Sequence, residues 1–519
     1  MHCPYSQELA AVLPRILSFF DRDKWSATFG VADRQHVSWC TTDFANGTQQ
    51  GAAHGLARLL AADMLPEWCP REEVLSIIQS AFDGTRSIMR SNGSMEEAFP
   101  MEASFCVTAL VAHDLLWASR LLPDLTDADK AYHIETVKPL IGFLLASDET
   151  HGCISNHLAT AVGALLLWHA ATGDQLAEKR AKELLERILD NSSHEGWFKE
   201  YDGADPGYQT LCLHYLTLAD SIRPDLGLRP ILVRAAQFLS YFAFPDGSFG
   251  GVFGSRRTRL WFPSGIALLA EESDTALSLS RFMKDSIARH GCVTLTAMDD
   301  PNLIPLFNSY AIAAEAERLV PAKPRAPLPC IDDAFEGRHF PEAGLLISST
   351  PHHYTVVSPR LGGAYESCSK DGQRHRVDGG SIVTKAGKHW STQTQDPAVT
   401  VSIGKDAITV TTRVSPLLRT RPTPIQLMGL RVLALTVMRI APVSRAIKNC
   451  MAFLLIGRKQ YLPLKVTRRI IVAGKLAETA ASLEPANAPV DRFVPDGGDF
   501  RSIHMASAGY WHDSKGSEQ

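Results

Sequence analysis

Apolar residues recur every three to four positions along the first part of the chain, a spacing that places them on one face of an α-helix. The pattern appears in about twelve segments up to about residue 322, and loops rich in Gly, Pro and Asp separate them. Strand patterns are nearly absent there. An even number of helices without a strict repeat period predicts antiparallel hairpins closed into an α/α toroid of about six hairpins.

Beyond residue 330 the pattern changes to alternation with a period of two, as in AGLLISST, HYTVVSPR and AITVTTRV. This alternation, with Gly, Asp and Ser between the runs, predicts an antiparallel β-sandwich. The proline-rich stretch VPAKPRAPLPC is typical of a linker between the two parts. The expected organisation is α+β and multidomain: a toroid over 1–322, a linker over 323–330, a β-sandwich over 331–505 and a polar tail over 506–519.

Residues 425–457 break the β rhythm with longer apolar blocks and isolated bases, a pattern that predicts two amphipathic helices inserted into the β domain. The chain has a net charge of −4, which gives no reason to expect a nucleic-acid partner. Between Asp406 and Glu478, however, there are thirteen bases and no acid. Two interpretations stay open: the insertion lies on an anionic membrane, or its apolar blocks are sandwich core and its bases line a groove for an acidic polymer.

The N-terminus lacks the basic and long apolar regions of a secretory signal, and no apolar run approaches the ~18–20 residues that span a bilayer. The ten cysteines form no C-x-x-C pair. We expect a cytoplasmic protein, peripheral to the inner membrane if the insertion binds lipid.

The first candidate site is the start of the helix SNHLATAVGALLLW, with Ser155 as the N-cap. Asn156 and His157 follow it, where the helix amides favour an anionic group. The alternative is that Asn156 caps the helix and His157 is a half-buried surface residue.

The second candidate is Tyr208, which the tight loop 202–207 delivers to the first turn of a helix. A tyrosine there serves as an acid or base if a neighbouring cation or histidine lowers its pKa from about 10. The alternative is a loop tyrosine that packs between helices.

The glycine-rich stretch 245–265 contains Arg256, Arg257 and Trp261. Arginine pairs with carboxylate or sulfate, and an aromatic ring stacks on sugars; the alternative is a solvated loop. Glu97 and Glu102 lie in a polar loop before another helix. One interpretation is that their carboxylates bind sugar hydroxyls; the alternative is that their negative charge only stabilises the N-terminus of that helix.

Together these features resemble the heparinase II/III-like polysaccharide lyase family over roughly residues 30–480. The resemblance rests on their order: an Asn-His helix start, a D-G-x-x-P-G-Y loop, a glycine-rich S-R-x-T loop, then R-H-F-P-E-A-G-L opening the β domain. It implies an α/α toroid followed by a β-sandwich, and cleavage of a uronic-acid polysaccharide by β-elimination.

The resemblance also implies roles for single residues. Asn156 and His157 would neutralise the substrate carboxylate, Tyr208 would be the acid, the base or both, and Arg256 would bind substrate. The anionic polysaccharide is the expected partner. The other expected substrate-binding residues are Arg257, Trp261, Glu97, Glu102, His352 and His353.

The chain departs from the family in the motif H-x-H-x-D-x-G-S, which supplies a catalytic histidine and a metal ligand. Aligned on Asp378, the chain has Arg374 and Arg376 at the histidine positions, and His375 is one residue out of phase. We therefore expect no metal cofactor and regard zinc as doubtful. If a histidine of the β domain reaches the cleft, it is His352, His353 or a bulged His375.

Two other functions stay open. One is a glycoside hydrolase on the same toroid, with a carboxylate pair such as Glu97 and Asp205. The other is a non-catalytic glycan-binding or assembly protein that kept the fold.

Overall fold

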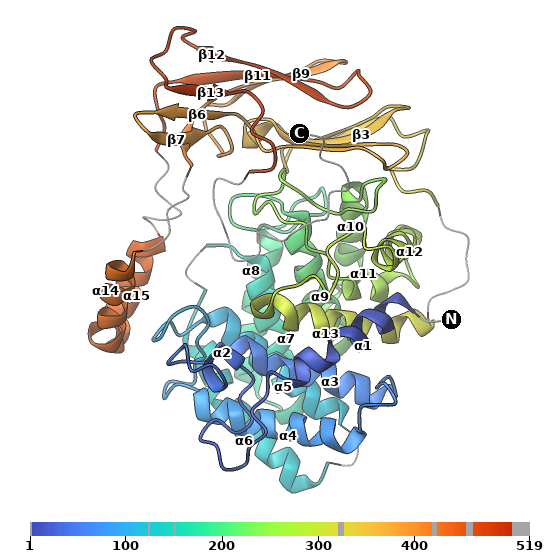
Figure 1. Cartoon of the computed structure of the whole chain (residues 1–519). Helices are drawn as coiled ribbons and strands as arrows, with labels where there is room; N and C mark the ends of the chain where they lie inside the picture. Colours follow the sequence, from blue (N-terminus) through green and yellow to red (C-terminus); the bar gives the residue numbers. More distant parts are fainter. Residues whose placement is uncertain are drawn as a thin grey trace.

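A computed structural model describes residues 3–122, 125–149, 152–319, 326–417, 423–452 and 460–500. It shows a helical domain, a β domain stacked on one end of it, and a helical hairpin that projects beside both (Figure 1). The first part of the predicted linker, 323–325, and the predicted tail, 506–519, lie outside the described residues.

The helices of the first domain follow the predicted periodic segments. They are α1 (Pro4–Leu17), α2 (Arg34–Val37), α3 (Ala52–Ala61), α4 (Arg71–Ile88), α5 (Phe105–Leu121), α6 (Asp127–Ala146), α7 (Ser155–Thr172), α8 (Gln175–Asp190), α9 (Pro206–Ile222), α10 (Arg229–Leu239), α11 (Ser264–Leu269), α12 (Asp274–Ala288) and α13 (Asp300–Ala316).

Six of these helices close into an inner ring, in the order α3, α5, α7, α9, α11, α13 and back to α3. Each inner helix packs against an outer partner: α4, α6, α8, α10, α12 and, for α13, α1. Inner helices such as α7 are buried on nearly every side, which explains why their sequences are apolar all round. The predicted α/α toroid of six hairpins is confirmed.

The β domain consists of antiparallel sheets. Its strands are β1 (Gly337–Phe340), β2 (Leu345–Ser349), β3 (His353–Ser358), β4 (Ala364–Ser369), β5 (His375–Asp378), β6 (Ile382–Lys385), β7 (Lys388–Ser391), β8 (Thr400–Ile403), β9 (Ala407–Arg413), β10 (Ser415–Pro416), β11 (Lys465–Ile471), β12 (Glu478–Glu484) and β13 (Arg492–Val494). One sheet has the order β1-β2-β3-β4-β5, a second β12-β11-β9-β8 and a third β10-β7-β6-β13.

The five-stranded sheet is buried on both faces. Leu345 and Ile347 of β2 join the core of the toroid, whereas Leu346 between them packs with Val410 and Ile470 of the second sheet. This alternation follows from the pleat, which sends successive side chains to opposite faces. The predicted antiparallel β-sandwich is confirmed, with the toroid covering one face of its first sheet.

The insertion forms two helices, α14 (Pro424–Leu435) and α15 (Ala441–Ala452), joined by the 3-10 turn η6 (Val437–Arg439). Its last residues, 453–457, lie outside the described part of the chain. The hairpin stands apart from the sheets (Figure 1), and most of α14 is exposed. The interpretation of its apolar blocks as sandwich core is therefore wrong. None of the helices in the described ranges has both the length and the apolar character needed to cross a membrane.

Candidate active site

The start of α7 presents Asn156 and His157 from the inner ring of the toroid. Ile154, not Ser155, occupies the N-cap position; Ser155 is the first helical residue, and its hydroxyl donates to the Lys199 carbonyl oxygen at 2.7 Å. That bond ties the first turn of α7 to the strand-like segment before α9. The prediction of Ser155 as the N-cap was wrong, but the expected placement of the two polar residues is confirmed.

The start of α9 presents Tyr208 as predicted. Asp205 is the N-cap, and its fully buried carboxylate accepts hydrogen bonds from the Tyr208 amide at 3.0 Å and from the Arg256 amide at 2.8 Å. A Cβ atom on Gly207 would lie 2.2 Å from the Thr258 hydroxyl oxygen, so only glycine permits this approach. Asp205 thus holds the glycine-rich loop against the helix that carries Tyr208.

Arg256 lies between two tyrosine rings. Its guanidinium carbon is 3.9 Å from the centroid of the Tyr208 ring and 4.9 Å from that of Tyr201. Burial alone would lower the pKa of Arg256, but Tyr208, Glu200 and Tyr201 raise it above its usual value. The guanidinium therefore stays charged beside the Tyr208 phenol.

Glu200 connects the start of α7 to the glycine-rich loop. Its carboxylate accepts from the Asn156 amide at 2.9 Å and from the Arg256 guanidinium at 2.8 Å, although the two donors lie on different elements. Burial raises the pKa of Glu200 in spite of the opposing charge of Arg256. Asn156, His157, Tyr208 and Arg256, predicted separately from the sequence, are therefore brought together in one site.

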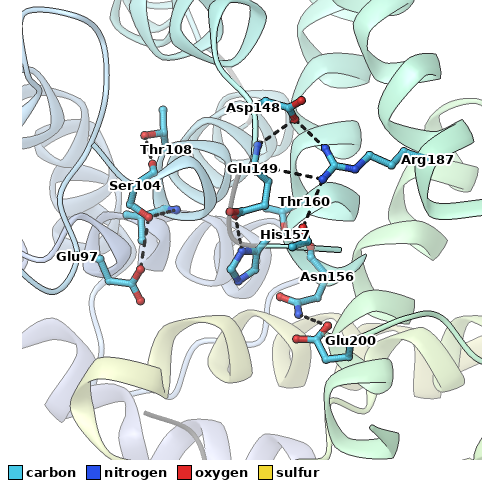
Figure 2. Close-up of polar contacts among 12 residues, drawn as sticks. Glu97, Ser104, Thr108, Asp148, Glu149, Asn156, His157, Thr160, Arg187 and Glu200 are labelled. Atoms are coloured by element: carbon cyan, nitrogen blue, oxygen red, sulfur yellow. Dashed lines mark hydrogen bonds and ion pairs between the residues drawn. The ribbon is translucent and has the colours of Figure 1, made fainter. Parts of the chain in front are cut away.

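His157 is oriented by an acid. Its Nδ1 lies 2.8 Å from Glu149 Oε2 (Figure 2). Its side chain is 21% exposed. Burial alone would lower the pKa of His157, but hydrogen bonds with Cys106 and Glu149 raise it well above 6.5. The raised pKa of His157 favours the protonated imidazole, which suits the neutralisation of a substrate carboxylate.

Glu97 and Glu102 lie on the loop before α5 at the edge of this site. Glu97 is exposed, and its carboxylate accepts from the Ser104 hydroxyl at 3.4 Å. Figure 2 shows it on the side of His157 away from Arg187. Glu102 turns back into the loop and accepts from the amides of Glu97 and Ala98. The position of Glu97 supports a substrate-binding role, whereas the carboxylate of Glu102 serves the loop.

Left-handed backbone conformations gather in the loops around the site. Met101 and Ala103 in the loop before α5, Tyr201 before α9, and Arg257 in the glycine-rich loop all have positive φ angles between 51° and 64°. Such conformations cost energy for residues other than glycine and cluster at functional sites.

Two predicted substrate-binding residues lie in packed surroundings instead. Trp261 is 1% exposed and packs edge-on against Phe249 in the toroid core. Arg257 is buried and donates to the Gln393 carbonyl oxygen of the β domain at 2.7 Å. The glycine-rich loop is therefore buried at the interface between the domains, and the alternative of a solvated loop is wrong. The buried Trp261 ring has no exposed face on which a sugar could stack.

His352 and His353 also lie away from the site. His353 is fully buried in the β domain, where its Nε2 lies 2.9 Å from the Val472 carbonyl oxygen. His352 is exposed in the turn between β2 and β3. Neither placement supports the predicted substrate-binding roles.

His375 is the β-domain histidine that faces the toroid. Its Nδ1 lies 2.7 Å from Asp246 Oδ2 in the toroid, and its Nε2 lies 3.0 Å from Glu366 Oε2 on β4. Glu366 also accepts from Arg259 at 2.7 Å. A Cβ atom on Gly251 would come within 2.2 Å of the same carboxylate, which explains the glycine. This cluster joins the two domains.

The position at which the resemblance implied a zinc motif is occupied by an ion pair. The Asp378 carboxylate accepts from Arg468 at 2.5 Å, from Thr479 at 2.6 Å and from the Gly380 amide at 2.9 Å, and both charged side chains are fully buried. A guanidinium thus supplies the positive charge there, and the surrounding residues do not fit a metal ion.

Two other groups within the described ranges have ligand atoms close enough for a metal: His54 with His113 and Asp114, and Asp246 with Cys368 and His375. In the first group both Nδ1 atoms already contact Asp114, and Arg58 donates to His54 at 3.2 Å. In the second, both nitrogens of His375 contact carboxylates. A carboxylate thus contacts at least one nitrogen of each of these histidines.

Sequence reasoning missed Glu149, Cys106, Glu200 and Tyr201. The last two directly precede the loop that delivers Tyr208, in EGWFKEYDGADPGY, and that position was a usable signal. Nothing comparable marks Glu149 or Cys106, which approach His157 only through the packing of the helices.

Comparison with known proteins finds no matching family model and no matching curated protein. Among solved structures, the chain is similar to a chondroitin AC lyase from Streptomyces coelicolor A3 in complex with chondroitin sulphate. That match has 12% identity and a TM-score of 0.54, and it covers 90% of this chain and 65% of the lyase. The chain thus spans just under two thirds of that enzyme's length.

Two further matches have lower scores. Heparinase III has 11% identity and a TM-score of 0.41, covering 90% of this chain and 75% of the other. A cellobiose 2-epimerase from Bacillus thermoamylovorans B4167 has 13% identity and a TM-score of 0.44, covering 60% and 98%. At these identities the likeness to the chondroitin lyase establishes the fold, a toroid followed by β-sheets.

Proposed function

We propose that this protein is a polysaccharide lyase that cleaves a uronic-acid-containing polymer by β-elimination. The observation that carries the proposal is the Tyr208 phenol beside the charged Arg256, on the same site as Asn156 and His157. A chondroitin AC lyase with the same fold acts as a precedent for an anionic substrate.

The chemistry requires each of these residue types. The proton on C5 of a uronate is weakly acidic, so donors must first neutralise the adjacent carboxylate. Protonated His157, the Asn156 amide and Arg256 supply those donors. Tyr208, in its phenolate form, accepts the C5 proton; the electron pair left on C5 forms the C4=C5 double bond and the C4–O4 bond breaks. The phenol then returns that proton to the departing O4 oxygen.

Glu200 has a place in this scheme. In the free protein its carboxylate accepts hydrogen bonds from Asn156 and Arg256, which are two of the donors that a substrate carboxylate needs. Its raised pKa makes it easier to protonate than an ordinary glutamate. A protonated Glu200 would no longer neutralise Arg256, so the positive charge of Arg256 would be available to the substrate carboxylate.

The test is incubation with a panel of uronate polymers. We expect products with 4,5-unsaturated ends, which absorb in the near ultraviolet. The mass of each such product should be one water less than that of the fragment that hydrolysis of the same bond would release. Tyr208→Phe should slow their formation by about 10²–10⁴-fold in a folded protein. Absence of such products from every uronate polymer would contradict the proposal.

A glycoside hydrolase is the second candidate, because Glu97, Glu149 and Glu200 all act on His157 or its neighbours. The pair considered from sequence, Glu97 with Asp205, does not fit, since Asp205 is fully buried as an N-cap. Reducing ends without near-ultraviolet absorbance would favour hydrolysis. A non-catalytic glycan-binding role predicts instead that Tyr208→Phe leaves the biological effect intact.

A further inference from the structure

The helix α14 exposes apolar side chains on every side. Ile425 is 75% exposed, Met428 62% and Val432 56%. Leu427, Leu433 and Leu435 are exposed as well, and at about 100° per residue these six positions surround the helix axis. The surface continues through Val437 and Ile440.

Such a surface is unusual for a protein in water. A helix that is apolar all round is normally buried in a protein core or in a membrane, and a large exposed apolar patch marks an interaction site. Here only Ala434 of α14 is buried. The described contacts of the hairpin with the toroid include an ion pair of Arg431 with Asp43 at 2.8 Å, the Arg431 guanidinium over the Phe44 ring, and the Ser444 hydroxyl at 3.5 Å from the Met101 carbonyl oxygen.

The charge of the hairpin selects among the possible partners. Between Pro424 and Ala452 the sequence has four bases and no acid. Arg439, at the turn between the helices, is exposed. An exposed apolar helix in a segment that has bases and no acid matches the headgroup region of an anionic bilayer. With twelve residues, α14 is far shorter than the ~20 residues that span a bilayer, so it would lie in the interface.

We propose that the hairpin α14–α15 is a membrane anchor that inserts the apolar surface of α14 into an anionic lipid leaflet. The hairpin projects from the edge of the molecule, where no sheet of the β domain covers it (Figure 1). Through Met101 it also touches the loop that carries Glu97. Lipid binding would therefore hold the candidate active site close to the membrane surface, where a glycan attached to or emerging from the membrane would be reached.

The test is flotation of the full-length chain with vesicles. We expect it to float with vesicles of mixed phosphatidylglycerol and phosphatidylcholine, and much less with phosphatidylcholine alone or at high salt, which screens the basic residues. In the variant Ile425→Gln/Met428→Gln/Val432→Gln the partition coefficient should fall by at least about tenfold, because three apolar side chains no longer leave water.

The matched control replaces three exposed apolar residues elsewhere: Leu176→Gln, Val401→Gln and Ile403→Gln. These side chains are 68%, 42% and 49% exposed. The control should float like the wild type, and both variants should keep the circular dichroism spectrum and melting temperature, since the replaced side chains bury little.

Several results would overturn the proposal. They are failure of the wild type to float with the anionic vesicles, equal flotation of the α14 variant, and equal flotation with neutral vesicles. A dimer in size-exclusion chromatography that the α14 variant converts to a monomer, without vesicle binding, would assign the surface to a second copy. None of these readouts uses catalysis, so they are independent of the lyase proposal.

Discussion

The guanidinium of Arg256 lies over the face of the Tyr208 ring, with its central carbon 3.9 Å from the ring centroid. Glu200 fixes the guanidinium with an ion pair of 2.8 Å, and Asp205 fixes the backbone of both residues. A cation in this place favours negative charge that develops on the phenol or on a bound carboxylate.

Replacement of Tyr208 by phenylalanine should separate chemistry from packing. The ring would keep its contact with Arg256, so we expect the melting temperature to change little. Loss of the phenol as acid or base should lower kcat by about 10²–10⁴-fold. Tyr132→Phe is the control, since Tyr132 lies on α6, hydrogen bonded to Asp83; equal losses in both variants would contradict the assignment.

Replacement of Glu149 by glutamine should change the pH dependence of the site. The raised pKa of His157 means that its protonation stabilises the fold, fully below about pH 6.5 and less as pH rises through the folded-state pKa. Removing the carboxylate lowers that pKa, so the high-pH loss of kcat/KM should move to lower pH. An NMR titration of the imidazole measures the same change directly.

Asp148→Asn is the matched control for this variant. Asp148 is next to Glu149 but pairs with Arg187 at 2.9 Å instead of His157. Its replacement should leave the pH profile in place. A profile that moves equally in both variants would argue that His157 titrates through general surface charge.

Replacement of Arg468 by methionine should destabilise the β domain by about 3–5 kcal/mol, because Asp378 would keep a buried charge without its partner. Adding Asp378→Asn should recover part of the loss. Arg469→Met, the exposed neighbour on β11, should change stability by no more than about 0.5 kcal/mol. Chemical denaturation followed by circular dichroism measures all three, and a chelator should leave the wild-type curve unchanged.

The interdomain cluster of His375 predicts a pH window for stability. Burial alone would lower the pKa of His375, but Asp246, Cys368 and Glu366 raise it well above 6.5. Burial would raise the pKa of Asp246, but His375 lowers it to about 2. The histidine contribution is thus lost as pH rises through its folded-state pKa, and the aspartate contribution as pH falls from about 4 toward 2.

Thermal melting from acid to alkaline pH measures this window. In His375→Gln the fall in melting temperature at alkaline pH should become smaller than in the wild type. His352→Gln, an exposed histidine of the same domain, should behave like the wild type. Identical alkaline curves for wild type and His375→Gln would show that protonation of His375 does not stabilise the protein.

Much of the fold follows from local periodicity. Apolar residues have helical spacing before residue 322 and alternate with polar ones after residue 330. Each spacing indicates the secondary structure that puts the apolar residues on one buried face, so the toroid and the sandwich were both predictable. The placement of Tyr208 was predictable for a similar reason, since the Asp-Pro-Gly loop before it determines where α9 begins.

Long-range packing decided the rest. Glu200 is 44 residues from Asn156 and 56 from Arg256, and no local sequence pattern predicts that the three side chains form hydrogen bonds with one another. Composition likewise could not tell that Trp261 is core, nor that Ile425 is exposed. By itself the sequence determined the elements and the first turns that carry Asn156, His157 and Tyr208, because those depend on neighbours along the chain. Only the tertiary structure decided which charges face one another and which apolar residues reach solvent, because both depend on contacts between distant segments.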